Sequence, residues 1–167
     1  NPDIIYVGAA SGGVWKTENS GQTWSPVFDE QTLQNIGAIA IQQSNPSVVW
    51  VGTGEGNPRN SLNLGAGIYK SLDGGKSWKM MGLEKTISIH RVVVDPVNPN
   101  TVYAAAIGNP FAEHPERGVF KTTDGGADWT QLNSGTDKSL MSLCFVNAAT
   151  GYVGGPSQLL RKTTDAG

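Results

Sequence analysis

Residues 67–78, GIYKSLDGGKSW, carry the design that organises the whole chain. A β-branched and aromatic run predicts a strand over 67–71, the glycines within 72–76 predict a tight turn, and a second strand opens at Trp78. The design returns as GVWKTENSGQTW at 13–24, as GVFKTTDGGADW at 118–129 and as LLRKTTDAG at 159–167, which holds no tryptophan. The remaining segments are spaced by these four copies.

Each copy has the same physical logic. Asp73 can accept hydrogen bonds from backbone N–H groups of its own turn. Gly75 falls where the chain needs a positive φ, and Trp78 is placed to pack beneath the turn. We therefore expect a structural role for these residues and for their equivalents in the other copies: Asn19, Gly21, Trp24, Asp124, Gly126, Trp129 and Asp165.

Three further segments recur around each copy. An Asn-Pro turn and a buried-type strand come before it, as in NPSVVWVGTG at 45–54. An alternating apolar segment such as IGAIAIQQ at 36–43 comes earlier still, and a short strand such as SWKMMG at 77–82 follows the turn. We label these four strand positions A (36–43 type), B (45–54 type), C (67–71 type) and D (77–82 type), and the chain reads B-C-D, A-B-C-D, A-B-C-D, A-B-C.

Repeats of this size predict an all-β fold, a β-propeller of four-stranded antiparallel blades. The equivalent lysines Lys16, Lys70, Lys121 and Lys162 are 54, 51 and 41 residues apart. The predicted units are an incomplete blade at 1–35, blades at 36–83 and 84–135, and an incomplete blade at 136–167. About three and a half blades leave unpaired edges, so we expect a fragment of a larger propeller. A self-assembling partial propeller is the alternative.

Composition narrows the function classes. The net charge is −2 without a basic run, so we expect no nucleic-acid partner, and no apolar stretch is long enough for membrane insertion. His90 and His114 are not in ligand spacing, so we expect no metal, and no motif indicates a cofactor. Cys144, the single cysteine, lies in the apolar run LMSLCFV and is expected to be a small core residue.

The repeated pattern Ser/Thr-x-Asp/Asn-x-Gly-x-x-Trp resembles the Asp-box, or BNR, repeat. That repeat is shared by sialidases, sortilin-type ectodomains, xyloglucanase-type propellers and photosystem II assembly-factor propellers. Residues 52–86, GTGEGNPRNSLNLGAGIYKSLDGGKSWKMMGLEKT, together with ERGVFKTTDGGADW at 116–129, are similar to large secreted bacterial BNR-repeat proteins labelled sortilin-like or glycosyl hydrolase-like. The resemblance extends from Asn1 to about Leu132, and FVNAATGYVGG at 145–155 is similar to the assembly-factor type. It implies a multi-bladed extracellular or cell-surface propeller and assigns no catalytic residues.

Antiparallel topology divides the loops between two ends of the blades. The C–D turns, which are the boxes, share one end with the A–B turns, and the longer B–C and D–A loops share the other. Variable loops on a rigid scaffold are the default binding surface. The loop at 53–66 offers Glu55, Asn57, Arg59 and Asn60, which could bind a sugar or a peptide carboxylate. Alternatively, Glu55 pairs with Arg59 and the asparagines satisfy the loop backbone.

The equivalent loop at 108–118 offers Phe111, Glu113, His114, Glu116 and Arg117. Phe111 is interpreted as a plug between blades or as a platform on which a ligand stacks. His90 and Arg91, at the start of an innermost strand, are either ligand contacts near the channel or ordinary strand residues. The candidate ligand-binding residues are thus Glu55, Asn57, Arg59, Asn60, His90, Arg91, Phe111, His114, Glu116 and Arg117.

The residue sets that sialidases and other glycosidases use for catalysis are not matched in this sequence. Sialidases need three arginines and a tyrosine nucleophile, but the four arginines occupy unlike positions and every tyrosine falls within a predicted strand. Glycosidases need two convergent carboxylates, and no spacing selects a pair among Glu55, Glu113, Glu116 and Asp29. We therefore predict a non-catalytic, secreted or surface-exposed scaffold that binds protein, peptide or glycan. The alternatives are a glycoside hydrolase with catalytic residues partly outside this segment, and a secretion or assembly accessory protein.

Overall fold

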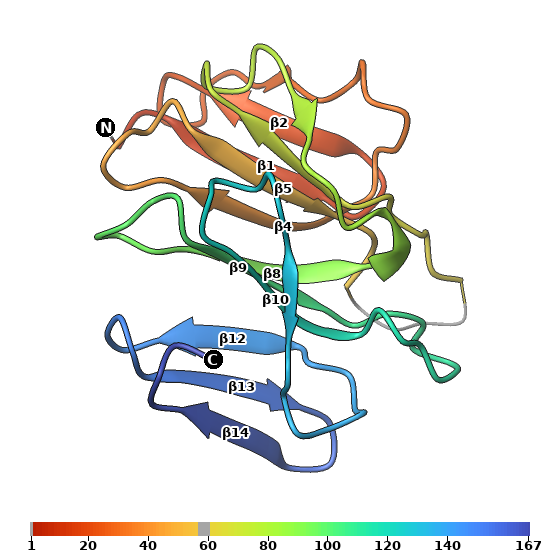
Figure 1. The fold of residues 1–167 in the computed structure, drawn as a ribbon. Helices are drawn as coiled ribbons and strands as arrows, with labels where there is room; N and C mark the ends of the chain where they lie inside the picture. The colour runs from red at the N-terminus through yellow and green to blue at the C-terminus, as the bar shows by residue number, and fades with distance from the viewer. Residues whose placement is uncertain (1, 57–60) are drawn as a thin grey trace.

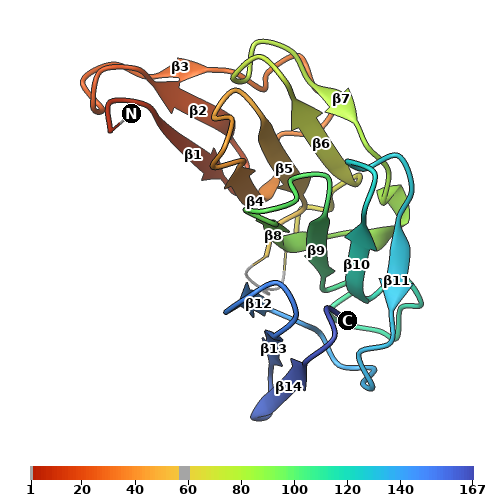
Figure 2. The same ribbon diagram turned by 60° about the vertical axis from the view of Figure 1, so that its left-hand side comes forward.

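The protein is a set of four antiparallel sheets arranged along an open arc (Figure 1). The computed structural model describes residues 2–56 and 61–167. Figure 2 shows the sheets following one another in chain order, from β1–β3 at one end to β12–β14 at the other. This arrangement confirms the predicted fold class, a partial β-propeller. The division at residues 35, 83 and 135 stays a proposal.

The strands follow the predicted order of positions in each sheet. The first sheet holds β1 (Ile5–Ala9), β2 (Gly13–Thr17) and β3 (Ser25–Pro26). The second holds β4 (Ile36–Ile41), β5 (Val49–Thr53), β6 (Ile68–Ser71) and β7 (Lys79–Met80). The third holds β8 (Ile89–Val94), β9 (Val102–Ala106), β10 (Gly118–Thr122) and β11 (Thr130–Leu132), after the 3₁₀ turn η1 (Glu84–Thr86). The fourth holds β12 (Ser142–Phe145), β13 (Gly151–Gly155) and β14 (Leu159–Thr163).

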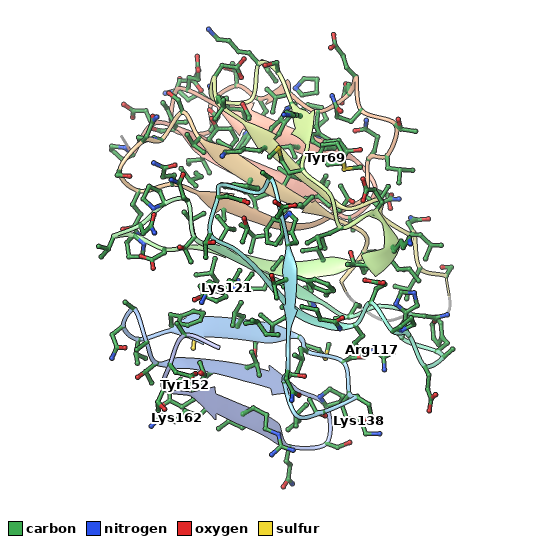
Figure 3. The ribbon with its side chains drawn as sticks, viewed as in Figure 1. Tyr69, Arg117, Lys121, Lys138, Tyr152 and Lys162 are labelled. Carbon is green, nitrogen blue, oxygen red and sulfur yellow. The ribbon has the colours of Figure 1, made fainter. Side chains whose placement is uncertain are left out.

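Each pair of neighbouring sheets encloses its own hydrophobic core. The core between the second and third sheets is built around Trp50, Ile68 and Phe120. The core between the first and second includes Tyr69 (Figure 3), whose ring stands edge-on to Phe28 at 5.2 Å. Strand β5 is buried along its whole length because sheets cover both of its faces. The blades are therefore held together by side-chain packing between sheets.

Side-chain alternation leaves the two end sheets with one uncovered face each. In β1, Ile5 is 41% exposed and Val7 46% exposed. In β12, Leu143 enters the core against the third sheet, whereas its neighbour Cys144 points to the other face and is exposed. The expectation that Cys144 is a core residue is therefore wrong, because the apolar run alternates between one covered and one uncovered face.

The box turns are closed by their own side chains. Asp73 accepts hydrogen bonds from the Ser71 hydroxyl (2.8 Å), the Ser77 amide (2.9 Å) and the Ser77 hydroxyl (2.6 Å). These bonds, those from Ser77 first, hold the pKa of the Asp73 carboxyl well below its usual value. Asn19 closes the first turn in the same way, accepting from the Thr23 amide at 2.9 Å. The turn therefore needs an acceptor oxygen, charged or neutral.

The tryptophan of a box reaches further than its own turn. The rings of Trp24 and Trp78 lie beside Gly21 and Gly75 of their own turns, whereas Gly126 lies against Trp50. The indole N–H groups of Trp78 and Trp129 cross to the preceding blade. Trp78 donates to the Val27 carbonyl at 2.6 Å, and Trp129 donates to the Met81 carbonyl at 2.7 Å. Trp24, with no sheet before it, donates to Gly21 of its own turn at 3.1 Å. The box tryptophan is thus an inter-blade contact.

Candidate binding face

Backbone hydrogen bonds place the boxes and the A–B turns at the same end of the sheets. In the second sheet the Gly74 amide donates to the Ser47 carbonyl at 2.8 Å, and in the third the Gly125 amide donates to Asn100 at 2.9 Å. We call this end the box face. It consists of the turns 18–24, 72–78 and 123–129 with the A–B turns 42–48 and 95–101.

The B–C and D–A loops meet at the opposite end, which we call the loop face (residues 54–56, 61–67, 83–88 and 107–117). The Gly65 amide donates to the Ile87 carbonyl at 2.7 Å, and the Ser88 hydroxyl donates to the Glu55 carbonyl at 3.0 Å. The B–C loop of the first sheet contacts the same surface, because the Asn63 side-chain amide of the second sheet's B–C loop donates to the Ser11 hydroxyl at 2.8 Å. The loops of successive blades therefore form one connected surface.

Glu55 is buried inside its own loop and binds the loop backbone. Its side chain is only 4% exposed, and its carboxylate accepts a hydrogen bond from the Asn63 amide at 3.3 Å. The expected partner Arg59, like Asn57 and Asn60, lies outside the described residues. The Glu55 carboxylate therefore lies within its loop and is not part of the exposed surface of the loop face.

Arg117 holds the second variable loop in place. Its guanidinium donates to the carbonyls of Ile107 (2.9 Å), Ala112 (2.8 Å) and Asp137 (2.9 Å), and also to that of Asn109. Figure 3 shows Arg117 at this edge of the third sheet. These carbonyls use the fork of N–H donors that would otherwise grip a carboxylate. Arg117 is thus a positioning residue for the loop at 108–118.

Phe111 projects from the loop that Arg117 holds. Its amide donates to the Asn109 side chain at 2.9 Å, which closes the turn beneath it, and its ring is 67% exposed. The interpretation that Phe111 plugs a gap between blades is therefore wrong, since the turn directs the ring outward. The ring has the exposure that a stacking platform requires.

The histidine candidates lie in two separate places. His90 is half-buried on β8 beside Gly56, and burial, followed by the charge of Arg91, lowers its pKa. Its Nδ1 has no hydrogen-bond partner among the described residues. His114 lies with Glu113 and Arg117 around a surface hollow that Gln131 and Asp137 also line.

The structure therefore groups the candidates into two clusters. Phe111, His114 and Arg117 share the loop at 108–118, and Glu116 belongs to the same loop. His90 lies against Gly56, the residue that follows Glu55, on the neighbouring part of the loop face. Arg91 is exposed on β8, whereas His90 before it is half-buried and Val92 after it is buried. Arg91 therefore belongs to neither cluster.

Sequence reasoning missed the residues that fix these loops. Asn109 precedes a proline and caps a local turn, so its local pattern could have identified it. Asn63 and Ser88 bind across 52 and 33 positions of the chain, and no local pattern predicts such bonds. Within 2–56 and 61–167, no group of three His, Cys, Asp or Glu residues could hold a metal ion, and no helix could span a bilayer.

Comparisons with known proteins agree with the fold. A family model described as "Sortilin-Vps10: Sortilin, neurotensin receptor 3" matches residues 12–151. The xyloglucanase Xgh74A of Acetivibrio thermocellus is 28% identical over 146 residues, which is 79% of this chain and 16% of that protein. A xyloglucanase of Hypocrea jecorina is 25% identical over 148 residues, 80% of this chain and again 16% of the relative. The chain thus spans about a sixth of the length of these relatives.

Solved structures share the architecture at lower identity. An ancestral GH74 enzyme superposes with a TM-score of 0.75 at 24% identity, over 100% of this chain and 22% of the other. YCF48 bound to D1 peptide superposes with a TM-score of 0.61 at 14% identity, over 98% of this chain and 52% of the other. At these identities the likeness shows the propeller fold.

Proposed function

Since this chain belongs to the Sortilin-Vps10 family, we propose that it is part of a β-propeller that binds a β-glucan of the xyloglucan type through its loop face. The observation that carries the proposal is Phe111, an exposed ring on a loop that Arg117 holds at four carbonyls. An aromatic ring offers an apolar face to the C–H groups of a sugar. A ring on a fixed loop binds with little loss of conformational freedom.

Sequence relatives favour a glucan over the other ligand classes. Both curated relatives described above are named xyloglucanases, and they match about four fifths of this chain. YCF48, whose solved structure holds a peptide, shares the fold at only 14% identity. A glucan is therefore the better supported ligand, and a peptide is the outcome to test against it.

Polar side chains in the same loop as Phe111 suit sugar hydroxyls. Glu116 and His114 are half-buried in the same loop, and the exposed Glu113 lies beside the same hollow. Carboxylate and imidazole side chains can each exchange hydrogen bonds with a diol. A polymer of this kind is met outside the cell, so we place the working protein at the cell surface or in the extracellular medium.

We propose a binding role for this segment, and hydrolysis as the second candidate. Glycoside hydrolysis needs two carboxylates about 5–9.5 Å apart across the scissile bond. Glu55 is buried in its loop, which leaves Glu113, Glu116 and Asp29 as the surface carboxylates among the predicted candidates. The relatives' names support hydrolysis by a longer protein in which this chain would supply part of the cleft wall.

Calorimetric titration of the chain with a xyloglucan oligosaccharide tests the proposal. We expect Phe111→Ala to weaken binding about tenfold, since removing a stacked ring costs about 1–2 kcal/mol. Val97→Ala is the matched control, because Val97 is 85% exposed on the box face. Equal affinity for wild type and Phe111→Ala would contradict the site, and no glucan binding by the wild type would contradict the ligand class.

A reducing-sugar assay separates the two candidates. The binding role predicts that this chain releases no reducing ends from xyloglucan. Release by the wild type that is lost in Glu116→Gln, with oligosaccharide affinity retained, would favour the hydrolase.

A further inference from the structure

Two junctions between neighbouring sheets can be compared position by position. At the first junction, between the first and second sheets, the indole of Trp78 donates to the Val27 carbonyl. At the second junction, between the second and third sheets, the indole of Trp129 donates to the Met81 carbonyl. Val27 and Met81 therefore occupy equivalent positions, and the space around their side chains can be compared directly.

Each junction also holds one box carbonyl by a polar side chain. The Tyr6 hydroxyl donates to the Gly74 carbonyl at 3.0 Å at the first junction, and the Lys70 ammonium donates to the Gly125 carbonyl at 3.0 Å at the second. Tyr6 and Trp50 are equivalent, because each lies in register with the lysine of position C. The two junctions are thus built on the same plan.

The junctions differ in what packs against the turn glycine. A Cβ on Gly126 would lie 2.7 Å from the Trp50 ring and 3.2 Å from the Met81 methyl group, so two bulky side chains close the second junction. A Cβ on Gly75 would lie 3.4 Å from Val27, its nearest contact. The side chain of Val27 ends two atoms short of the methyl group of a methionine. The first junction is therefore the less filled of the two.

A groove lies at this less filled junction. It consists of two adjoining hollows, one on the box face and one along the outer edge of the sheets, which share Val27, Gly75 and Lys76. Figure 2 shows the turn between β6 and β7 next to β3, where the two hollows meet. We call this feature the junction groove, and its defining residues are Thr23, Val27, Glu30, Gly75, Lys76 and Trp78.

The two ends of the junction groove differ in charge. At the box-face end Lys16 and Glu18 neutralise each other at 2.6 Å. At the other end Asp29 and Glu30 are exposed, and within 2–56 and 61–167 neither carboxylate is within ion-pair distance of a lysine or arginine. Lys76 is the exposed cation between the two ends. The end at Asp29 and Glu30 therefore attracts a positive charge.

The edge strand beside the groove limits how an occupant can bind. Pro26 in β3 has no N–H group, and the Val27 amide already donates to the Val14 carbonyl at 2.8 Å. A peptide therefore meets no row of free N–H donors on which to add itself as a further strand. Recognition in the junction groove has to come from side chains.

We propose that the junction groove binds an extended peptide segment of a protein partner, in which an aliphatic side chain is followed by a basic residue. The aliphatic side chain occupies the space beside Val27 and Gly75, as Met81 does at the second junction, and the basic residue pairs with Glu30. Shape and charge together select this occupant, because a glucan supplies neither an aliphatic side chain nor a cation. The junction groove is separate from the loop face, so this binding does not rest on the glucan proposal.

NMR titration of the isotope-labelled 167-residue chain with the peptide acetyl-Gly-Ser-Leu-Lys-Lys-Ser-Gly-amide tests the proposal. We expect the amide signals of Gly75 and Ser77 to shift with a dissociation constant of about 0.1–1 mM, the strength of one buried side chain and a few charges. The same peptide with aspartates in place of the lysines is the control, and repulsion should weaken its binding about tenfold or more.

Two variants locate the contact. Val27→Met puts the side chain of the second junction into the first, so it should weaken peptide binding about tenfold while the melting temperature stays equal or rises. Glu30→Gln should weaken binding about threefold, the loss of one exposed ion pair. Asp128→Asn, on an exposed carboxylate of the third box, is its matched control and should leave binding unchanged.

Four results overturn the proposal. They are the absence of shifts at Gly75 with about 5 mM peptide, well above the expected constant, equal affinity of wild type and Val27→Met, equal affinity of Glu30→Gln and Asp128→Asn, and equal binding of the acidic peptide. Shifts of the Gly75 and Ser77 signals on concentrating the chain alone would identify a second copy as the occupant, which also overturns the peptide.

Discussion

The two ends of the sheets carry loops of opposite kinds. On the box face the turns are short, alike in sequence and closed by their own Asp or Asn side chains, and they bind neighbouring blades through a tryptophan and a carbonyl. On the loop face the connections are long and unlike one another, and each is held by contacts of its own, such as those of Arg117. The contacts that stabilise the blades are therefore repeated from sheet to sheet, whereas the loops on which we propose ligand binding are not. A ligand site built on unrepeated loops can change without disturbing the blades.

The largest effect on stability is expected at a box tryptophan. Trp129→Ala removes the ring that packs edge-on to Trp50 at 6.3 Å and the hydrogen bond to Met81. We expect a loss of about 3 kcal/mol in the free energy of unfolding, measured by urea denaturation. Trp24→Ala is the matched control, since no sheet formed by residues 2–56 and 61–167 covers Trp24, and it should cost under about 1 kcal/mol in this chain. Equal losses would show that the ring acts within its own turn.

Acid sensitivity should distinguish the charged boxes from the first one. Hydrogen bonds hold the folded-state pKa of Asp73 and Asp124 below the unfolded value, which is about 3.9. Such groups stabilise the fold fully above the unfolded pKa, and the contribution is lost as the pH falls through the folded pKa. We expect Asp73→Asn to flatten the fall in melting temperature below about pH 4.

Asn19 shows that an amide oxygen can serve in the same place, so the variant should fold. Asn19→Ala, which removes an uncharged acceptor, should lower the melting temperature equally at pH 7 and at low pH. A slope in Asp73→Asn as steep as in the wild type would contradict the role assigned to the carboxylate.

The smallest effect on stability is expected on the loop face. Arg117→Lys keeps the charge but loses the fork that reaches several carbonyls, so the loop at 108–118 should open. Limited proteolysis should cut this loop faster while the melting temperature changes little. Arg161→Lys is the control, since Arg161 makes one long contact, 3.4 Å to Gly135. Unchanged proteolysis in Arg117→Lys would refute its positioning role.

What the sequence by itself determined are the features governed by short-range rules. The all-β class, the A-to-D order and the placement of the boxes follow from turn residues and from alternation within segments of 10–20 positions. The two ends of the sheets could also be assigned, because antiparallel connections alternate between them. Positions such as Asp73 act on atoms at most four residues away, which a local pattern encodes.

What only the tertiary structure decided are the features that depend on which neighbour is present. Cys144 and Leu160 lie in apolar runs, but no sheet covers the face to which they point. By sequence Phe111 fits either a plug between blades or a stacking platform, and in the structure its ring is 67% exposed on the loop that Arg117 holds. Lys121 on β10 donates to the Ala166 carbonyl, 45 positions further along the chain. The exposure and the partners of these side chains depend on contacts between residues that are far apart in the sequence. A local sequence pattern does not show which distant segments lie next to one another.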